Sequence, residues 1–148
     1  MTSDSGGLAL HLEKVLQTRR EDVFEACVDP KKLADWWGPA GFTCPSLDLD
    51  ARQGGGYRIT MQPPDGEAFH LRGEFRELEP PRRLVYTFEY EEPDPDDQKT
   101  VVTLSFLEHG EGTKLVLDQA PFRTEARRAL HERGWTDSLD RLEAFLSL

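Results

Sequence analysis

The middle of the chain alternates apolar and polar residues, and one long helical stretch follows it. Between residues 47 and 117, apolar side chains recur at every second position in short segments separated by turns such as Pro63-Pro64-Asp65-Gly66. The short connections predict an antiparallel meander. Its apolar face must be covered, and the stretch after Thr124 is the only segment long enough to cover it. The predicted fold is therefore α+β, with a curved antiparallel sheet of about six or seven strands wrapped around a long C-terminal helix.

A strand and two short helices are predicted before the meander. Residues 8–16 have the period of a strand, with a shift of phase around Lys14, and a helix follows from about Arg20. Asp29-Pro30 predicts the start of a second short helix, because aspartate caps helix N-termini and proline fits the first helical position. Gly38-Pro39 ends this helix. The order of elements is that of a helix-grip fold, in which the two short helices close one end of the sheet.

Two of the expected helices carry tryptophan residues. Trp36 and Trp37 end the second short helix, and neighbouring side chains on a helix point about 100° apart. We therefore expect one indole in the core and the other at the mouth of a cavity. The long helix carries one apolar stripe, formed by Trp135, Leu139, Leu142 and Leu146. Leu130 falls outside this stripe, which predicts a kink or break near Gly134.

Charge and cysteine content limit the partners and the compartment. The net charge is −10, with 28 acidic and 18 basic residues; such a surface repels nucleic acid and anionic membranes, so neither is expected as a partner. The sequence has no signal-peptide pattern and no run of about 18 apolar residues, which predicts a cytoplasmic protein. Cys27 is expected to be a buried thiol and Cys44 a loop residue. Residues 1–7 are expected to form a disordered tail, and residues 8–148 a single domain.

The sequence contains no recognisable catalytic, phosphate-binding or metal-binding motif. There is no Ser/His/Asp arrangement and no Gly-x-Ser-x-Gly elbow. Gly54-Gly55-Gly56 lacks the lysine and helix of a phosphate loop and predicts a tight bend. The acidic segment 91–98 lacks the glycine and final glutamate of a calcium loop and is expected to be solvated. No histidine or cysteine spacing suggests zinc. The sequence therefore predicts no catalytic residue, no metal and no cofactor.

Several motifs taken together resemble those of one protein family. They are Val23-Phe24-Glu25-Ala26, Asp29-Pro30, Trp36-Trp37-Gly38-Pro39, Gly54-Gly55, Pro80-Pro81-Arg82-Arg83-Leu84 and Gly134-Trp135, and they extend over nearly the whole chain. With these residues, the chain is similar to homologues of the activator of the heat-shock protein 90 ATPase. This family belongs to the START-like (SRPBCC, birch-pollen-allergen-like) superfamily, and many of its members have no assigned function. The resemblance implies an elongated cavity between the sheet and the long helix for apolar or amphipathic ligands.

We expect a small hydrophobic or amphipathic molecule as the partner, bound without catalysis by a monomer or a homodimer. The side chains expected to line the cavity are Trp37, Phe42, Met61, Phe69, Leu71, Phe88, His131, Trp135 and Leu139. His131 is expected to form a hydrogen bond at the cavity edge. The strand parity stays open, because Arg58, Arg72 and Glu74 would line the cavity if the other sheet face were concave.

Two other functions fit the resemblance. A cyclase or lyase would use polar groups of the cavity such as Arg72 or His131, with the histidine as a general base. This hypothesis requires those side chains to converge inside one cavity. A cochaperone-like interaction module would instead require an exposed apolar or charged patch.

Overall fold

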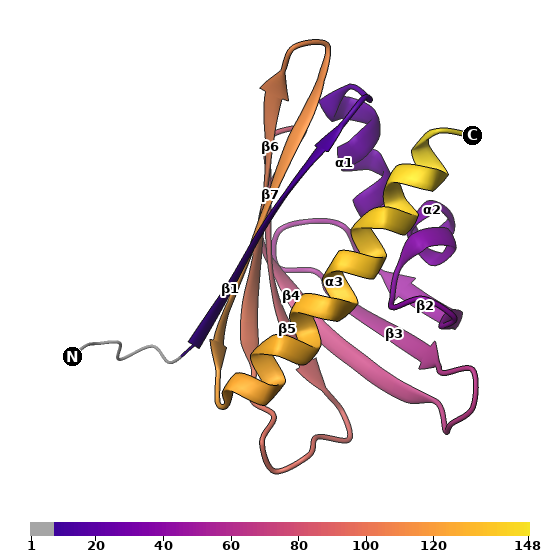
Figure 1. Cartoon of the computed structure of the whole chain (residues 1–148), viewed down its shortest axis with the longest axis vertical. Helices are drawn as coiled ribbons and strands as arrows, with labels where there is room; N and C mark the ends of the chain where they lie inside the picture. Colours follow the sequence, from indigo (N-terminus) through magenta and orange to yellow (C-terminus); the bar gives the residue numbers. More distant parts are fainter. Residues whose placement is uncertain (1–7) are drawn as a thin grey trace, which may run out of the picture.

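The computed structural model describes residues 8–148, so the predicted tail at residues 1–7 lies outside the described part. The elements follow the predicted order (Figure 1): β1 (Leu8–Leu16), α1 (Arg20–Val28), α2 (Pro30–Trp36), β2 (Thr43–Leu49), β3 (Gly56–Gln62), β4 (Phe69–Glu79), β5 (Arg83–Tyr90), β6 (Thr100–His109), β7 (Gly112–Phe122) and α3 (Glu125–Leu146). The seven strands form one sheet in the order β1-β7-β6-β5-β4-β3-β2. Each neighbouring pair is antiparallel. The predicted α+β helix-grip fold is confirmed.

The core lies between the inner face of the sheet and α3. The helix crosses the curved sheet, and α1 and α2 lie near its C-terminal half (Figure 1). Apolar side chains of the inner face alternate with exposed or half-exposed ones along β3, β4, β6 and β7, as the period of a strand requires, whereas residues 84–88 of β5 are all buried. On α3, Trp135, Leu139 and Leu142 are buried against them. The apolar stripe on α3 therefore covers part of the sheet, and buried residues of α1 and α2, among them Phe24 and Trp36, pack into the same core.

Side-chain caps fix the start of α2, as predicted, and also the start of α3. The carboxylate of Asp29 accepts the backbone N–H of Lys31 at 2.9 Å, and Pro30 occupies the first turn of α2. The Thr124 hydroxyl accepts the backbone N–H of Arg127 at 3.1 Å at the start of α3. A cap of this kind contributes about 1 kcal/mol. The two caps place the helix starts at residues where sequence already favours them.

The predicted phase shift of β1 at Lys14 is wrong. The strand keeps its alternation there: Leu10 and Leu16 are buried, Lys14 lies between them on the same side, and Val15 is 39% exposed. The Lys14 ammonium lies 2.9 Å from Asp140 and 3.0 Å from Glu143, both on α3. A lysine fits this inner row because its apolar stem packs along the strand while the helix edge supplies two carboxylates.

The predicted kink at Gly134 is also wrong, because α3 runs unbroken from Glu125 to Leu146. A Cβ atom at position 134 would lie 3.5 Å from the Cγ atom of Pro39, so the glycine sits where the segment after α2 approaches the helix. Leu130 falls outside the buried stripe because its side chain is 41% exposed, not because the helix bends. A Cβ atom at 3.5 Å would make an ordinary van der Waals contact, so neither a bend of the helix nor a steric conflict accounts for glycine at this position.

Three smaller predictions concern the two cysteines and the glycine triplet. Cys44 lies in β2 and not in a loop, and both Cys27 and Cys44 are free thiols, with Cys27 buried as expected. The tight bend at the glycine triplet is confirmed, since Gly54 has a φ of +85° and a Cβ at Gly55 would lie 2.1 Å from a backbone oxygen.

Candidate ligand pocket

A pocket of about 160 Å³ lies between α3 and the inner face of β3, β4 and β5. Its walls also include part of the segment 37–42, which connects α2 to β2 and is called the corner segment below. The lining residues are Trp37, Gly38, Pro39, Phe42, Met61, Phe69, Leu71, Phe88, Tyr90, Leu130, His131, Gly134, Trp135 and Ser138. The lining is mostly aromatic and aliphatic, as in many small-molecule sites.

The structure brings eight of the nine expected lining residues to this pocket. They are Trp37, Phe42, Met61, Phe69, Leu71, Phe88, His131 and Trp135. Leu139 does not line it: this side chain is 4% exposed and belongs to the core. Leu139 lies on the same helical stripe as Trp135 but one turn further along, beyond the end of the pocket. Whether these eight residues bind a ligand stays a prediction.

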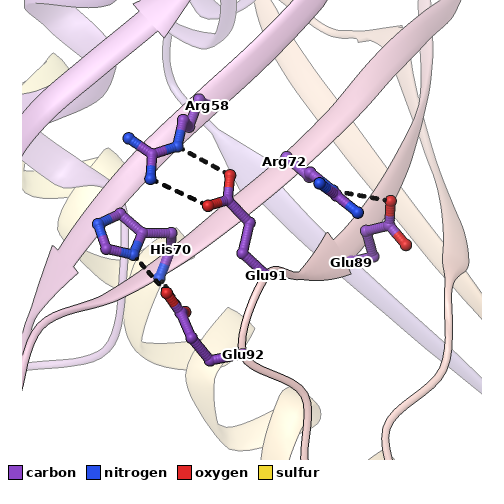
Figure 2. Close-up of polar contacts among 6 residues, drawn as sticks. All are labelled: Arg58, His70, Arg72, Glu89, Glu91 and Glu92. Atoms are coloured by element: carbon purple, nitrogen blue, oxygen red, sulfur yellow. Dashed lines mark hydrogen bonds and ion pairs between the residues drawn. The ribbon is translucent and has the colours of Figure 1, made fainter.

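The strand parity that the sequence left open is settled by the sheet. Tyr57, Met61 and Phe75 face the core, so Arg58, Arg72 and Glu74 lie on the exposed outer face. Figure 2 shows the two arginines paired with carboxylates there.

Both outer-face arginines are held by neighbouring strands or loops. Arg58 donates to the two carboxylate oxygens of Glu91 at 2.8 and 2.9 Å, and Arg72 donates to Glu89 at 3.1 Å (Figure 2). The arginines therefore lie on the opposite side of the sheet from the pocket and cannot orient a ligand inside it.

The corner segment is tied to α3 by polar contacts. One terminal nitrogen of Arg141, Nη1, donates to the carbonyl oxygens of Trp37, Gly38 and Pro39 at 3.1, 2.9 and 3.1 Å. The Ser138 hydroxyl oxygen accepts the backbone N–H of Gly38 at 3.1 Å. These contacts satisfy backbone groups of the C-cap residue Trp37 and of Gly38 and Pro39, which follow the end of α2. They also hold one wall of the pocket against the helix.

Glycine is favoured at position 38 for two reasons. Its φ is +102°, a region that residues with a Cβ rarely adopt. A Cβ there would also lie 2.4 Å from the Cε atom of Met61, which lines the pocket. The sharp turn after Trp37 therefore sets the position of the pocket wall.

The two neighbouring tryptophans have different surroundings. Trp36 is 1% exposed, and its indole N–H donates to the carbonyl oxygen of Ala26 at 2.9 Å. Trp37 lines the pocket and packs edge-on against Trp135, with ring centroids 5.0 Å apart. The expectation of one core indole and one cavity indole agrees with this arrangement, although Trp37 is also largely buried at 6% exposure.

His131 and Tyr90 form the polar end of the pocket. The Tyr90 hydroxyl oxygen lies 3.1 Å from Nε2 of His131, and the imidazole is surrounded by the rings of Phe88, Tyr90 and Phe122. Burial, assisted by the positive charge of Arg127, lowers the pKa of His131 to about 4. Burial raises the pKa of Tyr90. Both side chains are therefore neutral near pH 7.

Sequence reasoning missed several lining residues. Tyr90 shares the parity of Phe88 on β5 and continues the same row, so alternation could have indicated it. Ser138 follows Trp135 by three positions and lies on the same face of α3. Gly38, Pro39 and Gly134 meet only through the approach of the corner segment to the helix, for which the sequence gives no signal.

One group of potential metal ligands lies outside the pocket. Within residues 8–148, His70, Glu91 and Glu92 place one ligand atom each within 4.8 Å of one another. These atoms already have partners: Glu91 accepts from Arg58, and Glu92 accepts the backbone N–H of His70 and lies 2.7 Å from its ring nitrogen Nδ1 (Figure 2). A cation would have to displace Arg58, and the contacts identify the group as part of the outer-face ion-pair network.

A comparison with protein-family models shows to which family the chain belongs. A family model described as activator of Hsp90 ATPase homolog 1-like protein matches residues 17–147. The chain belongs to this family. The family and the helix-grip sheet together place the chain in the START-like superfamily, as the motifs indicated. No curated protein matches the chain.

Several solved structures share the fold over nearly the whole chain. Protein CV1439 from Chromobacterium violaceum is 29% identical, with a TM-score of 0.87, and the match covers 95% of this chain and 97% of that one. The AHSA1 (SPO3351) protein from Silicibacter pomeroyi is also 29% identical, with a TM-score of 0.83 over 95% and 98% of the two chains. CalU16 from Micromonospora echinospora is 27% identical, with a TM-score of 0.71 over 94% and 76%.

The length and apolar character of the helices are relevant to membrane insertion. Within residues 8–148, no helix combines the length and apolar character needed to cross a membrane.

Proposed function

We propose that the chain binds a small, mainly apolar molecule in the pocket between α3 and the sheet. The observation that carries this proposal is the pocket itself, whose walls are apolar and come from strands, a helix and a corner segment tied to that helix. Membership of a START-like family supports the same function. The proposed setting is the cytoplasm.

The pocket volume limits the size of the ligand. A cavity of about 150 Å³ holds one benzene ring, and the pocket here measures about 160 Å³. An aromatic ring buries about 150–250 Å², which at about 25 cal/mol per Å² corresponds to about 4–6 kcal/mol. The expected dissociation constants therefore lie between about 1 mM and tens of micromolar. Larger ligands would have to extend past the rim.

Binding is tested by incubating the full chain with a lipid extract and with one-ring aromatic compounds. Native mass spectrometry should detect a bound mass after the extract, and nuclear magnetic resonance titration should show saturable shifts at pocket residues. No bound mass and no saturable shift with either set of compounds would refute the proposal.

Two exposed leucines provide a matched pair of variants. Leu130 lines the pocket and is 41% exposed, whereas Leu107 on β6 is 45% exposed and does not line it. Because neither is buried, both alanine variants should fold. Leu130→Ala should weaken binding of an aromatic ring at least threefold, and Leu107→Ala should leave it unchanged. Equal effects would place the ligand outside the pocket.

The geometry favours binding over the cyclase or lyase hypothesis. That hypothesis requires Arg72 and His131 to converge, but Arg72 lies on the outer face and pairs with Glu89. His131 remains in the pocket, with a lowered pKa of about 4 that makes it a weak base. No contact in the described residues favours the cochaperone-like alternative.

A further inference from the structure

Two buried donors in the pocket lining have no hydrogen-bond acceptor among residues 8–148. The indole N–H groups of Trp36 and Trp135 donate to Ala26 and Gln119, but that of Trp37 meets no acceptor among residues 8–148, although Trp37 is only 6% exposed. The Ser138 hydroxyl accepts from Gly38, yet its own hydrogen reaches no acceptor within the same residues, and the side chain is 4% exposed. Both residues line the pocket.

The Tyr90–His131 pair adds a third donor, whichever tautomer is present. A neutral tyrosine and a neutral imidazole carry two polar hydrogens between them. Their mutual hydrogen bond at 3.1 Å uses one of these. If Tyr90 donates, the second hydrogen is on Nδ1 of His131; if His131 donates, it is on the Tyr90 hydroxyl. The described chain offers no acceptor for either, so one donor always remains.

Three backbone acceptors of the corner segment are already occupied. Arg141 donates to the carbonyl oxygens of Trp37, Gly38 and Pro39, and residues 37–39 all line the pocket. The polar groups left over are therefore mainly donors. A buried donor without an acceptor is unfavourable, so an acceptor on the ligand would complement the pocket.

The charge of the lining side chains limits the class of ligand further. Among the described lining residues there is no aspartate, glutamate, lysine or arginine, and His131 is neutral near pH 7. An ionised ligand would lose its hydration without meeting an opposite charge. Volume and charge together select small neutral molecules.

We propose that the pocket selects an uncharged, one-ring compound that carries a carbonyl oxygen or a comparable acceptor, which would accept from one of the unused donors on Trp37, Ser138 and the Tyr90–His131 pair, all of which line the pocket. This inference rests on the proposed function, because it names the class of ligand for the same pocket.

Two compounds of nearly the same shape test the proposal on the full chain. Acetophenone carries a carbonyl group where 2-phenylpropene carries a C=CH₂ group. A purely apolar pocket binds the hydrocarbon more tightly, because the ketone loses hydrogen bonds to water on entering. We expect acetophenone to bind at least as tightly as 2-phenylpropene, and benzoate at least tenfold more weakly than acetophenone, as measured by calorimetric or magnetic resonance titration at pH 7.

The outcomes separate this proposal from the proposed function. Tighter binding of 2-phenylpropene would overturn the acceptor preference and leave apolar binding in place. Tighter binding of benzoate would overturn the preference for neutral ligands. Failure of all three compounds to bind would overturn this inference, and the lipid-extract experiment would then decide on apolar binding by itself.

Alanine variants of two serines, Ser138 and Ser147, test the role of the hydroxyl group. Ser138→Ala should weaken acetophenone binding at least fivefold and change 2-phenylpropene binding less than twofold, because only the ketone uses the hydroxyl. Ser147→Ala, at the exposed end of the same helix, should change neither. An equal loss for both compounds in Ser138→Ala would show that the hydroxyl acts only through its contact with Gly38, and would remove it from the donor set.

Discussion

Replacing Arg141 tests whether the corner segment depends on its contacts with α3. Nη1 of this arginine approaches three carbonyl oxygens at 2.9–3.1 Å, but one nitrogen carries only two hydrogens, so the three contacts amount to about two hydrogen bonds. A hydrogen bond to a charged group contributes about 1.5–3 kcal/mol. Arg141 is half-buried, so the lower value applies. Arg141→Met should therefore lower the free energy of unfolding by about 3 kcal/mol.

Urea and thermal unfolding, followed by tryptophan fluorescence, measure this loss. At about 2–4 °C per kcal/mol for a chain of this size, the midpoint should fall by about 6–12 °C. Arg133→Met is the matched control, because Arg133 lies on the same helix, is exposed and has no ion pair or hydrogen bond from its side chain to residues 8–148. A difference of less than about 1 kcal/mol between the two variants would refute the reasoning.

Three other changes have calculable effects. Trp36→Phe leaves the Ala26 carbonyl oxygen without its donor and should cost about 2–3 kcal/mol in urea unfolding; no loss would mean that water replaces the indole. Gly38→Ala combines a φ of +102° with a contact to Met61 and should cost about 2–3 kcal/mol, whereas Gly110→Ala, with φ +60° and open space, should cost only about 1 kcal/mol; equal losses would exclude the Met61 contact. The pKa of His131 falls from 6.5 to about 4 on folding, so well above pH 6.5 the imidazole is neutral in both states and its ionisation adds no pH dependence to stability. Between pH 6.5 and 4 the unfolded chain binds a proton that the folded chain does not, and stability should fall by up to about 3 kcal/mol. The wild type should therefore lose about 2–3 kcal/mol more than His131→Leu when urea unfolding is compared at pH 7 and pH 4.5, and parallel losses would contradict the lowered pKa.

Local sequence signals were sufficient for the elements of the fold. Strand alternation, the Asp29-Pro30 cap and the stripe that contains Trp135 each act over a few residues, and the structure confirms each of them. The errors at Lys14 and Gly134 have one physical origin. Each residue was interpreted from its own segment, whereas its partner lies on another element: α3 for Lys14, and the corner segment for Gly134.

The candidate site was only partly predictable for a related reason. Alternation shows that Arg72 and Leu71 point to opposite faces of the sheet, but it does not show which face is covered. It could therefore not place Arg72 outside and Leu71 inside. The position of α3 shows which face of the sheet is covered. Most lining residues were found because large apolar side chains are expected inside, while Tyr90 and Ser138 were missed because polar residues become lining residues only through tertiary contacts.

The corner segment links the stability of the fold to the binding site. The contacts that Arg141 and Ser138 make with it satisfy the backbone after α2 and also hold Trp37 and Gly38 in the pocket wall. A change that loosens these contacts should therefore weaken the fold and ligand binding together. Conversely, a ligand present at ten times its dissociation constant stabilises the folded chain by about 1.4 kcal/mol. Removal of the outer-face pair Arg72–Glu89 should leave binding unchanged, because that pair lies on the other side of the sheet and is worth about 0–1 kcal/mol at an exposed site.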